Sequence, residues 1–378
     1  MMKKFILALI SMSLLLASGC AHIEEYDTEE TADTEETTEV QTVTVDNPEY
    51  YTRFKNDGIS INVYNWGEYI DSTVNDKFEE ETGIKVVYDE YDNNESMYAT
   101  LKNGAAKYDV IFPSDYMISR LIEEDMIEPL NFDNIPNFEH IMDRFKGLEY
   151  DPQNQYSVPY TWGIIGLLYN KEYVTETPTS WSALWDEKYS GKTLMYNNSR
   201  DALGITLIRN GADVNTTDTA ILDTAAQDVK GLKKNLQAFV SDEIFNLMES
   251  GSAYMTPAYG GDVLTMMEEN SDLAYVVPEE GTNLFVDAMC VVKGSKNKEA
   301  AEKYIDFLCR EDIAALNREE TCYSTPQQQV FESLDDETKN ELIAYPTNEI
   351  LDKSQVYTNL PRETLDYYST LWTDIKNS

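Results

Sequence analysis

Aromatic residues recur in this sequence at points where predicted strands give way to loops. Trp66 ends the alternating apolar run 59–63, Tyr116 lies just after the buried run 108–112, and Tyr259 follows another short apolar run. Acidic residues accompany the rings in these loops. Protonated amines are attracted to aromatic faces and donate strong hydrogen bonds to carboxylates. Acidic and aromatic side chains at loop ends would therefore suit an amine better than a sugar, an anion or a ferric ion.

Two aspartates stand where a carboxylate could take part in this chemistry. Asp287 lies inside the apolar run 284–292, where a buried carboxylate needs a partner. Asp201 stands at the start of the helix predicted over 202–209, where it could either cap the helix or contact a ligand. The aromatic residues, Trp66 included, could equally belong to a hydrophobic core. The residues alone leave these alternatives open.

The elements around Trp66 are expected to be a strand, a helix and a second strand. Apolar residues with period two predict the first strand, over 59–65. Capping residues and a closing glycine predict a helix over 71–83, and an apolar run predicts a strand over 84–88. In such a unit ligands lie outside the carboxyl ends of the strands, where Trp66 is expected.

Farther along, an amphipathic pattern predicts one helix over 219–239.

Strands and helices alternate along the body, which predicts an α/β fold with two lobes, each a sheet flanked by helices. The apolar runs 158–169 and 284–292 are expected to cross between the lobes, as a clamshell that closes on a ligand requires. The predicted boundaries are 58–162 plus 286–331 for the first lobe, and 163–285 plus 332–378 for the second.

The N-terminus has the pattern of an export signal. Lysines at 3 and 4, the apolar run 5–16 and a small-residue exit predict a signal peptide over 1–19, too short to span a membrane stably. Cys20 directly after Ser-Gly resembles a bacterial lipobox, which predicts a lipid anchor on the extracytoplasmic face of the membrane. A chance cysteine after an ordinary signal is the alternative.

The following segment, 20–57, is rich in acids and threonine and is predicted to be a disordered tether. The whole chain is also acidic, with 69 Asp and Glu against 29 Lys and Arg and a formal net charge of −40. This charge makes nucleic acid and anionic membranes poor partners, so contact with the membrane is expected only through the N-terminal lipid.

Neither a disulfide framework nor a catalytic motif is evident. Cys290 and Cys309 lie in apolar surroundings and are expected to be buried thiols, while a bridge between Cys309 and Cys322 stays open. With two histidines and no cysteine pairs, a zinc site is not expected, and no cofactor is predicted. The sequence has no G-x-S-x-G, H-E-x-x-H or G-x-G-x-x-G after a strand, so it is not expected to be an enzyme. A surface adhesin or structural lipoprotein is a second competing interpretation, suggested by the tether.

Several motifs, in this order, resemble the extracytoplasmic polyamine-binding proteins (spermidine/putrescine type) that feed ABC importers. The likeness extends from about residue 59 to about residue 372. It implies a fold like that of the type II periplasmic binding proteins, a polyamine ligand, ABC permease subunits as partners and a monomeric state. The motifs are Tyr64-Asn65-Trp66-x-Glu68-Tyr69, Glu81 to Val86, Asn94 to Leu101, Tyr108-Asp109 to Pro113-Ser114, Tyr156 to Gly163, Thr179-Ser180-Trp181, Pro278-Glu279-x-Gly281 and Asn297 to Ala300.

The resemblance also implies a set of ligand-binding residues. Trp66 and Tyr323 would be walls, Asp201 and Asp287 ammonium acceptors, and the others polar or aromatic contacts, with Gln355 placed less surely because the alignment there needs a gap. The full set is Trp66, Gly67, Glu68, Ser114, Asp115, Tyr116, Asn198, Asp201, Tyr259, Phe285, Asp287, Tyr323 and Gln355.

At four of these positions, the residue differs from the one found in a polyamine-binding relative. Gly67 replaces a residue with a hydroxyl, Tyr259 and Phe285 stand in place of tryptophans, and Asn198 stands in place of an aspartate. An amide accepts a hydrogen bond but contributes no charge, so a third cationic centre would be held less well. The hypothesis is that a diamine such as putrescine is bound at least as well as spermidine.

Overall fold

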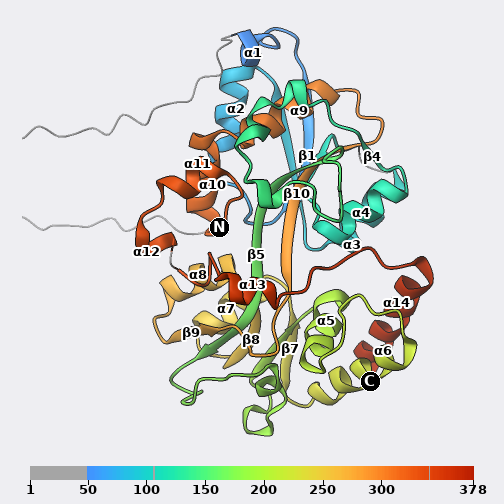
Figure 1. The fold of residues 1–378 in the computed structure, drawn as a ribbon, viewed down its shortest axis with the longest axis vertical. Helices are drawn as coiled ribbons and strands as arrows, with labels where there is room; N and C mark the ends of the chain where they lie inside the picture. Colours follow the sequence, from blue (N-terminus) through green and yellow to red (C-terminus); the bar gives the residue numbers. More distant parts are fainter. Residues whose placement is uncertain (1–48, 105–106, 340) are drawn as a thin grey trace, which may run out of the picture. The chain divides into compact units, whose positions relative to one another are not determined.

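The computed structural model describes residues 49–104, 107–339 and 341–378 (Figure 1). Its strands form a single mixed sheet, in the order β2-β1-β3-β10-β5-β8-β6-β7, with β4 also paired to β10 and β9 to β5. The strands are β1 (Ser60–Trp66), β2 (Lys85–Tyr91), β3 (Val110–Ile111), β4 (Ile127–Glu128), β5 (Ser157–Asn170), β6 (Thr193–Tyr196), β7 (Leu236–Val240), β8 (Met255–Tyr259), β9 (Leu273–Val276) and β10 (Leu284–Val292).

Helices alternate with these strands and cover the sheet, so the predicted α/β class is confirmed. The α-helices are α1 (Glu49–Thr52), α2 (Val74–Thr82), α3 (Asn94–Asn103), α4 (Asp115–Glu123), α5 (Ser199–Arg209), α6 (Thr219–Leu232), α7 (Glu243–Glu249), α8 (Gly260–Glu269), α9 (Lys298–Leu308), α10 (Glu311–Thr321), α11 (Gln328–Ser333), α12 (Asp336–Lys339), α13 (Asn348–Asp352) and α14 (Arg362–Asn377).

The strand–helix–strand unit around Trp66 is present, with β1 and β2 parallel and α2 between them in the chain. Gly83 ends α2 in the left-handed region, at φ 74°. A Cβ at this position would lie 2.7 Å from Cα of Lys55, so both the turn and the close approach of the chain require glycine here.

Strand β5 joins two halves of the sheet. Its first part pairs with β10, and its last residues, from Ile165 on, pair with β8 and β9 instead. Strand β10 is in turn antiparallel to β3 and β4, and β3 pairs with β1. The two predicted crossings therefore exist as β5 and β10, while the residue boundaries of the lobes stay a prediction.

The C-terminal helix packs far from β1 in the chain and in space. Tyr368, Leu371 and Ile375 of α14 share a buried cluster with Leu203 of α5 and Val229 of α6.

The helix predicted over 219–239 was wrong in its last turns, because α6 ends at Leu232 and β7 begins at Leu236, parallel to β6. The amphipathic pattern continues across this break because β7 also buries one of its faces.

The predicted tether was wrong for its last residues. Tyr51 lies in α1 and donates a hydrogen bond to Asp306, and Phe54 is 7% exposed within the main core. Figure 1 shows α1 beside α2. Tyr51 and Phe54 bring enough apolar surface to hold this segment against the body. The predicted signal peptide, Cys20 and the tether up to residue 48 lie outside the described residues.

The structure also bears on the expectations about the cysteines and about membrane-spanning helices. Cys290 and Cys309 are buried free thiols as predicted, and Cys322 is a free thiol of intermediate exposure. Within residues 49–104, 107–339 and 341–378, no helix combines the length and the apolar character that a bilayer crossing requires.

Candidate ligand-binding site

Trp66 lies at the carboxyl end of β1, where the sequence placed it. Its indole N–H donates a hydrogen bond of 2.7 Å to the carbonyl of Phe112, at the end of the neighbouring β3. Its ring contacts the ring of Tyr91, with 4.7 Å between centroids. These two contacts fix the indole in place and leave it only partly buried.

Asp287 lies on β10 and is 4% exposed. The hydroxyl of Tyr69 donates a 2.7 Å hydrogen bond to its Oδ2, while Oδ1 has no partner among the described residues. The backbone of Asp287 bridges that of Ser114, where the β5–β10 pairing shifts register. Burial raises the pKa of Asp287 to about 6, because removal from water disfavours the charged form, while hydrogen bonds from Ser114 and Tyr69 oppose this rise. Oδ1 of this carboxylate is therefore a buried acceptor that could take a further hydrogen bond.

Asp201 supplies a second buried carboxylate, in the first turn of α5, and is also 4% exposed. Asn198 donates from Nδ2 to its Oδ2 over 2.6 Å, and the hydroxyl of Tyr259 donates to the same oxygen. The helix cap is Asn198, whose Oδ1 accepts the N–H of Asp201, so Asp201 is not needed as the cap. Burial raises the pKa of Asp201, and the charge of Asp201 raises that of Asp287. The two carboxylates thus share one neighbourhood.

Five aromatic rings connect the two carboxylates. Their centroids are separated by 6.4 Å for Trp66 and Tyr69, 5.1 Å for Tyr69 and Tyr323, 6.1 Å for Tyr323 and Phe285, and 5.3 Å for Phe285 and Tyr259. We call this series the ring arc. Tyr69 in the arc holds Asp287, and Tyr259 at its far end holds Asp201. Residues from widely separated parts of the chain therefore form one wall with a carboxylate toward each end.

Glycines let the ring arc lie close to the sheet. A Cβ at Gly163 in β5 would lie 2.9 Å from Cζ of Phe285, and one at Gly261 in α8 would overlap the ring of Tyr323. Any larger residue would have to displace these rings. The choice of glycine at positions 163 and 261 is therefore as constrained as the choice of the rings that these glycines face.

Ser114 and Asp115 follow β3 but have different surroundings. The hydroxyl of Ser114 accepts a 3.0 Å hydrogen bond from Nδ2 of Asn94. Asp115 is fully buried, and its carboxylate accepts the backbone N–H of Tyr116 at 2.6 Å and that of Val286 at 3.4 Å. Burial raises the pKa of Asp115 well above its ordinary value. The structure thus places Asp115 as a link between α4 and β10.

Tyr116 connects the ring-lined region to two charged groups. Its hydroxyl donates to Oε1 of Glu95 over 3.0 Å, and its ring lies 5.5 Å from the guanidinium carbon of Arg200 and 6.1 Å from the ring of Tyr357. Burial raises the pKa of Glu95, and the charge of Asp201 raises it further. Tyr116 and Glu95 therefore lie on the side of the site near Asp201.

The last three predicted residues lie at the margins or away from the carboxylates. Glu68 is exposed, with a left-handed φ of 53°, and a Cβ at Gly67 would lie 3.9 Å from Oδ2 of Asp242. The side chain of Gln355 accepts the backbone N–H of Val214 at 3.0 Å. Gln355 thus braces a loop of the second half of the sheet, and the structure gives no contact between its amide and either carboxylate.

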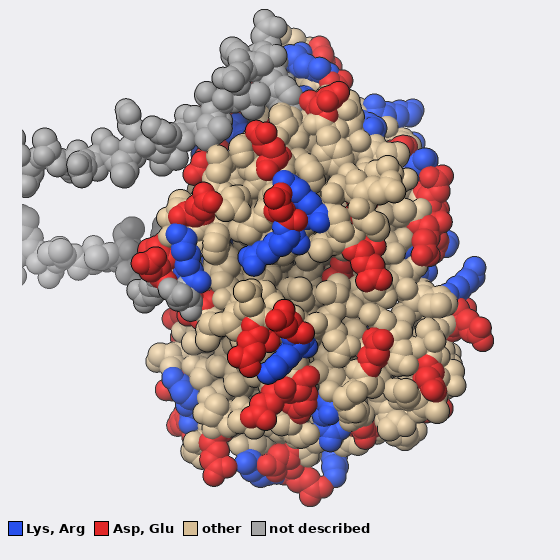
Figure 2. Space-filling model, viewed as in Figure 1, with Lys and Arg blue, Asp and Glu red and all other residues tan. Residues whose placement is uncertain are grey.

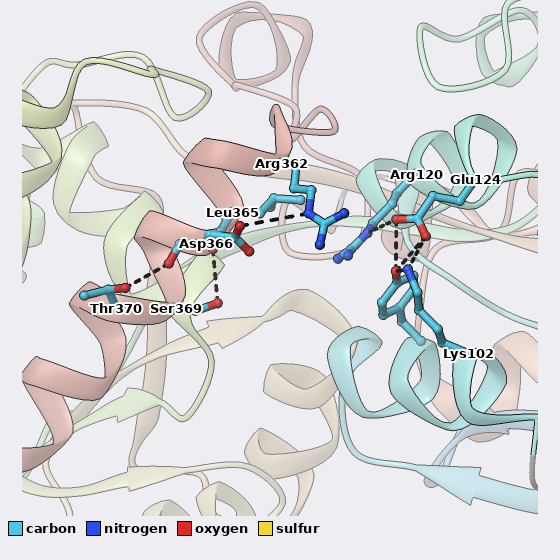
Figure 3. A network of polar contacts seen from close by, with 9 residues as sticks. Lys102, Arg120, Glu124, Arg362, Leu365, Asp366, Ser369 and Thr370 are labelled. Atoms are coloured by element: carbon cyan, nitrogen blue, oxygen red, sulfur yellow. Dashed lines mark hydrogen bonds and ion pairs between the residues drawn. The ribbon is translucent and has the colours of Figure 1, made fainter.

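The segment that follows Gln355 also contacts α4. Nδ2 of Asn359 donates to Oε2 of Glu123 over 2.7 Å. In Figure 3, Arg362 on α14 points toward Arg120 of α4 and Glu124, the residue that follows α4, and these two are joined by a 3.1 Å ion pair. Contacts between the two halves thus continue beyond the ring arc to the molecular surface.

Sequence reasoning did not identify Tyr69 and Asp262 as partners of the predicted ligand-binding residues. Tyr69 was part of a motif, but nothing in its position showed that its hydroxyl would meet Asp287. Asp262 accepts a 2.7 Å hydrogen bond from the hydroxyl of Tyr323, and burial raises its pKa to about 7. Its position after the paired glycines 260–261 at the end of β8 was the available signal.

The buried polar groups of this region include carboxylates, which accept hydrogen bonds and whose charged form a cation would stabilise. Within the described ranges, no group of three or more His, Cys, Asp and Glu side chains is placed to hold a metal ion. Acidic side chains are dispersed over the face in Figure 2 rather than gathered in one patch, so general surface charge does not mark the site. Fold and site together define a solute-binding protein, with ring walls and buried carboxylates between two sheet halves.

The chain belongs to a family described as bacterial extracellular solute-binding protein, whose model matches residues 73–344. It is 33% identical over 303 residues to the spermidine/putrescine-binding periplasmic protein of Salmonella typhimurium, covering 79% of this chain and 86% of the relative. It is 28% identical to the putrescine-binding periplasmic protein SpuD of Pseudomonas aeruginosa, covering 84% of this chain and 92% of SpuD.

Solved structures that resemble this chain are also solute-binding proteins or transporters of the spermidine/putrescine type. A Listeria monocytogenes protein described as a spermidine/putrescine ABC transporter is 36% identical, with a TM-score of 0.81 and coverage of 84% of this chain and 98% of that one. The spermidine/putrescine ABC transporter substrate-binding protein PotD of Streptococcus pneumoniae is 35% identical, with a TM-score of 0.73 and coverage of 84% and 99%. The predicted family and the clamshell fold class are thereby confirmed.

Proposed function

We propose that this protein captures a polyamine between the ring arc and the carboxylates of Asp201 and Asp287 and delivers it to an ABC permease. The observation that carries the proposal is Oδ1 of Asp287, a buried acceptor beside aromatic rings that has no hydrogen-bond partner among the described residues. A buried carboxylate without a cation is costly, and an ammonium group would supply both the charge and the missing hydrogen bond. The similarity to relatives named as spermidine/putrescine-binding and putrescine-binding proteins supports the same ligand class.

Rough magnitudes support a need for both parts of the site. Two charge-assisted hydrogen bonds contribute about 1.5–3 kcal/mol each, and a few ring contacts contribute about 0.5–2 kcal/mol each. Their sum reaches roughly the 8 kcal/mol of a micromolar complex. Neither the carboxylates nor the ring arc would suffice alone once the entropy cost of association is subtracted.

The site also supports a preference among polyamines. Asn198 uses its amide to cap α5 and to donate to Asp201, and it brings no negative charge for a third ammonium. We therefore infer that putrescine is bound at least as tightly as spermidine. Calorimetric titration with both would contradict this inference if spermidine bound tenfold or more tightly.

A thermal-shift panel tests the ligand class. Amines should raise the melting temperature, whereas sugars and amino acids should not, and Asp287→Ala should abolish the rise. Asp352→Asn, at an exposed aspartate in α13, is the matched control and should keep the response. A rise with sugars or neutral amino acids instead of amines would favour the alternative, in which the same fold binds another small solute.

We further infer that the protein is a carrier rather than an enzyme, and that it acts as a monomer. Putrescine recovered chemically unchanged after incubation with the protein, by mass spectrometry, is the expected result. Light scattering after size exclusion should give the mass of one chain.

The N-terminal sequence supports export and lipidation at Cys20. In a bacterial host the wild-type chain should partition into detergent, and Cys20→Ser should move it to the aqueous phase. Mass spectrometry of an unmodified Cys20 in the mature protein would contradict the anchor.

A further inference from the structure

We propose that the protein has a halide site behind the ring arc, in a cavity between β5 and α10. Asn317, Arg318, Thr161 and Tyr323 are among its lining residues. Among the described residues, Arg318 is the one charged residue that lines it, although acids outnumber bases 69 to 29 in the sequence. A cavity that excludes acids in so acidic a chain is suited to an anion.

Two of the residues that line this cavity carry a buried donor without a hydrogen-bond partner among the described residues. Asn317 is 5% exposed, and its Oδ1 accepts the backbone N–H of Asp71 at 3.0 Å. Its Nδ2 and the buried Nε of Arg318 have no hydrogen-bond partner among the described residues. The hydroxyls of Thr161 and Tyr323 are already engaged with Tyr69 and Asp262. Two free donors match an anion, which only accepts hydrogen bonds, better than water, which must also donate.

The size of the cavity limits the kind of anion. Its volume is about 20 Å³, just above the roughly 10–15 Å³ that a single water molecule needs. Phosphate, sulfate and organic acids are therefore too large, whereas chloride needs only small adjustments of the lining. A second guanidinium, that of Arg144, lies near Tyr345 together with that of Arg318 and adds to the local positive charge.

The halide would lie behind the groups that face the proposed ligand. Thr161 is hydrogen-bonded to Tyr69, which donates to Asp287, and Tyr323 belongs to the ring arc. An anion on one side of these residues and an ammonium on the other attract each other, so each should bind more tightly when the other is present. This coupling rests on the proposed function, but the halide site itself does not.

Crystals of the ligand-free protein transferred to sodium bromide test the site directly. An anomalous bromide peak is expected between Nδ2 of Asn317 and Nε of Arg318. Arg318→Gln and Asn317→Asp should each abolish it, the latter while retaining an oxygen for the N–H of Asp71. Arg362→Gln, at a side chain 93% exposed, removes the same charge elsewhere and should retain the peak. A missing peak in the wild type, or a peak that persists in Arg318→Gln, would overturn the proposal.

Titrations with putrescine in sodium chloride and in sodium gluconate at equal ionic strength test the coupling. The wild type and Arg362→Gln should bind at least threefold more tightly in chloride, and Arg318→Gln should bind equally in both salts. An equal chloride effect in all three proteins would refute the coupling. If putrescine fails to bind in either salt while the bromide peak is present, the proposed function fails and the halide site stands.

Discussion

Replacement of Asp287 by asparagine should weaken ligand binding and, at the same pH, stabilise the ligand-free protein. Burial raises the pKa of Asp287 to about 6, against an ordinary value of about 3.9. The folded state therefore holds a proton on this group between about pH 4 and 6 that the unfolded state has lost. In this window stability falls as pH rises, and the full penalty is present above about pH 6.

The difference between the two pKa values corresponds to a penalty of up to roughly 3 kcal/mol at neutral pH. Asparagine carries no charge and keeps an oxygen for the hydroxyl of Tyr69, so most of this penalty should disappear. Denaturant unfolding at pH 7.5 should show the ligand-free Asp287→Asn protein more stable by about 1–3 kcal/mol. The loss of one charge-assisted hydrogen bond costs about 1.5–3 kcal/mol, which raises the Kd for putrescine by about 10- to 150-fold.

Calorimetry and denaturant unfolding on the same preparations check both halves of this prediction. Asp352→Asn is the control and should change neither quantity by more than about 0.5 kcal/mol. A mutant that is less stable than the wild type, yet binds putrescine within twofold of it, would refute the reasoning. Asp287 would then be an ordinary structural carboxylate.

Three further predictions follow from other parts of the structure. The Kd for putrescine should rise about tenfold between pH 7.5 and pH 5, because protonation of Asp287 below its pKa of about 6 removes the charge that the ligand needs; a flat profile would contradict this. Gly163→Ala should displace the ring of Phe285 and weaken binding at least fivefold by calorimetry, whereas Gly231→Ala, exposed in α6 with open space around it, should stabilise the protein by about 0.5–1 kcal/mol. Phe54→Ala should lower the unfolding free energy by about 3–5 kcal/mol. A change below about 1 kcal/mol would show that residues 51–57 belong to the tether and do not pack against the body.

The sequence predicted those features that have a local signal. A period-two apolar run located β1, continuous apolar runs located β5 and β10, and a carboxylate amid apolar neighbours singled out Asp287. The break between α6 and β7 was missed because each element buries one face, which gives similar patterns over a short window.

Features decided by distant contacts could not be predicted in this way. Nothing near Tyr69 in the chain reveals that its hydroxyl meets Asp287, 218 positions away. Ser114 and Asp115 are neighbours in one loop, yet the side chain of Asp115 turns to the backbone of Val286 in β10. The packing of Phe54 likewise depends on a core completed by other parts of the chain.

The position of β10 has a consequence for how the chain matures. Strand β3 pairs with β1 on one side and with β10 on the other, and residues 284–292 are synthesised last among these strands. During translation, the edge of β3 has no native neighbour until more than 170 further residues have emerged. The first half of the sheet therefore completes late, which leaves the nascent chain open to chaperones and to threading through a pore, and makes a late truncation more damaging than its length suggests.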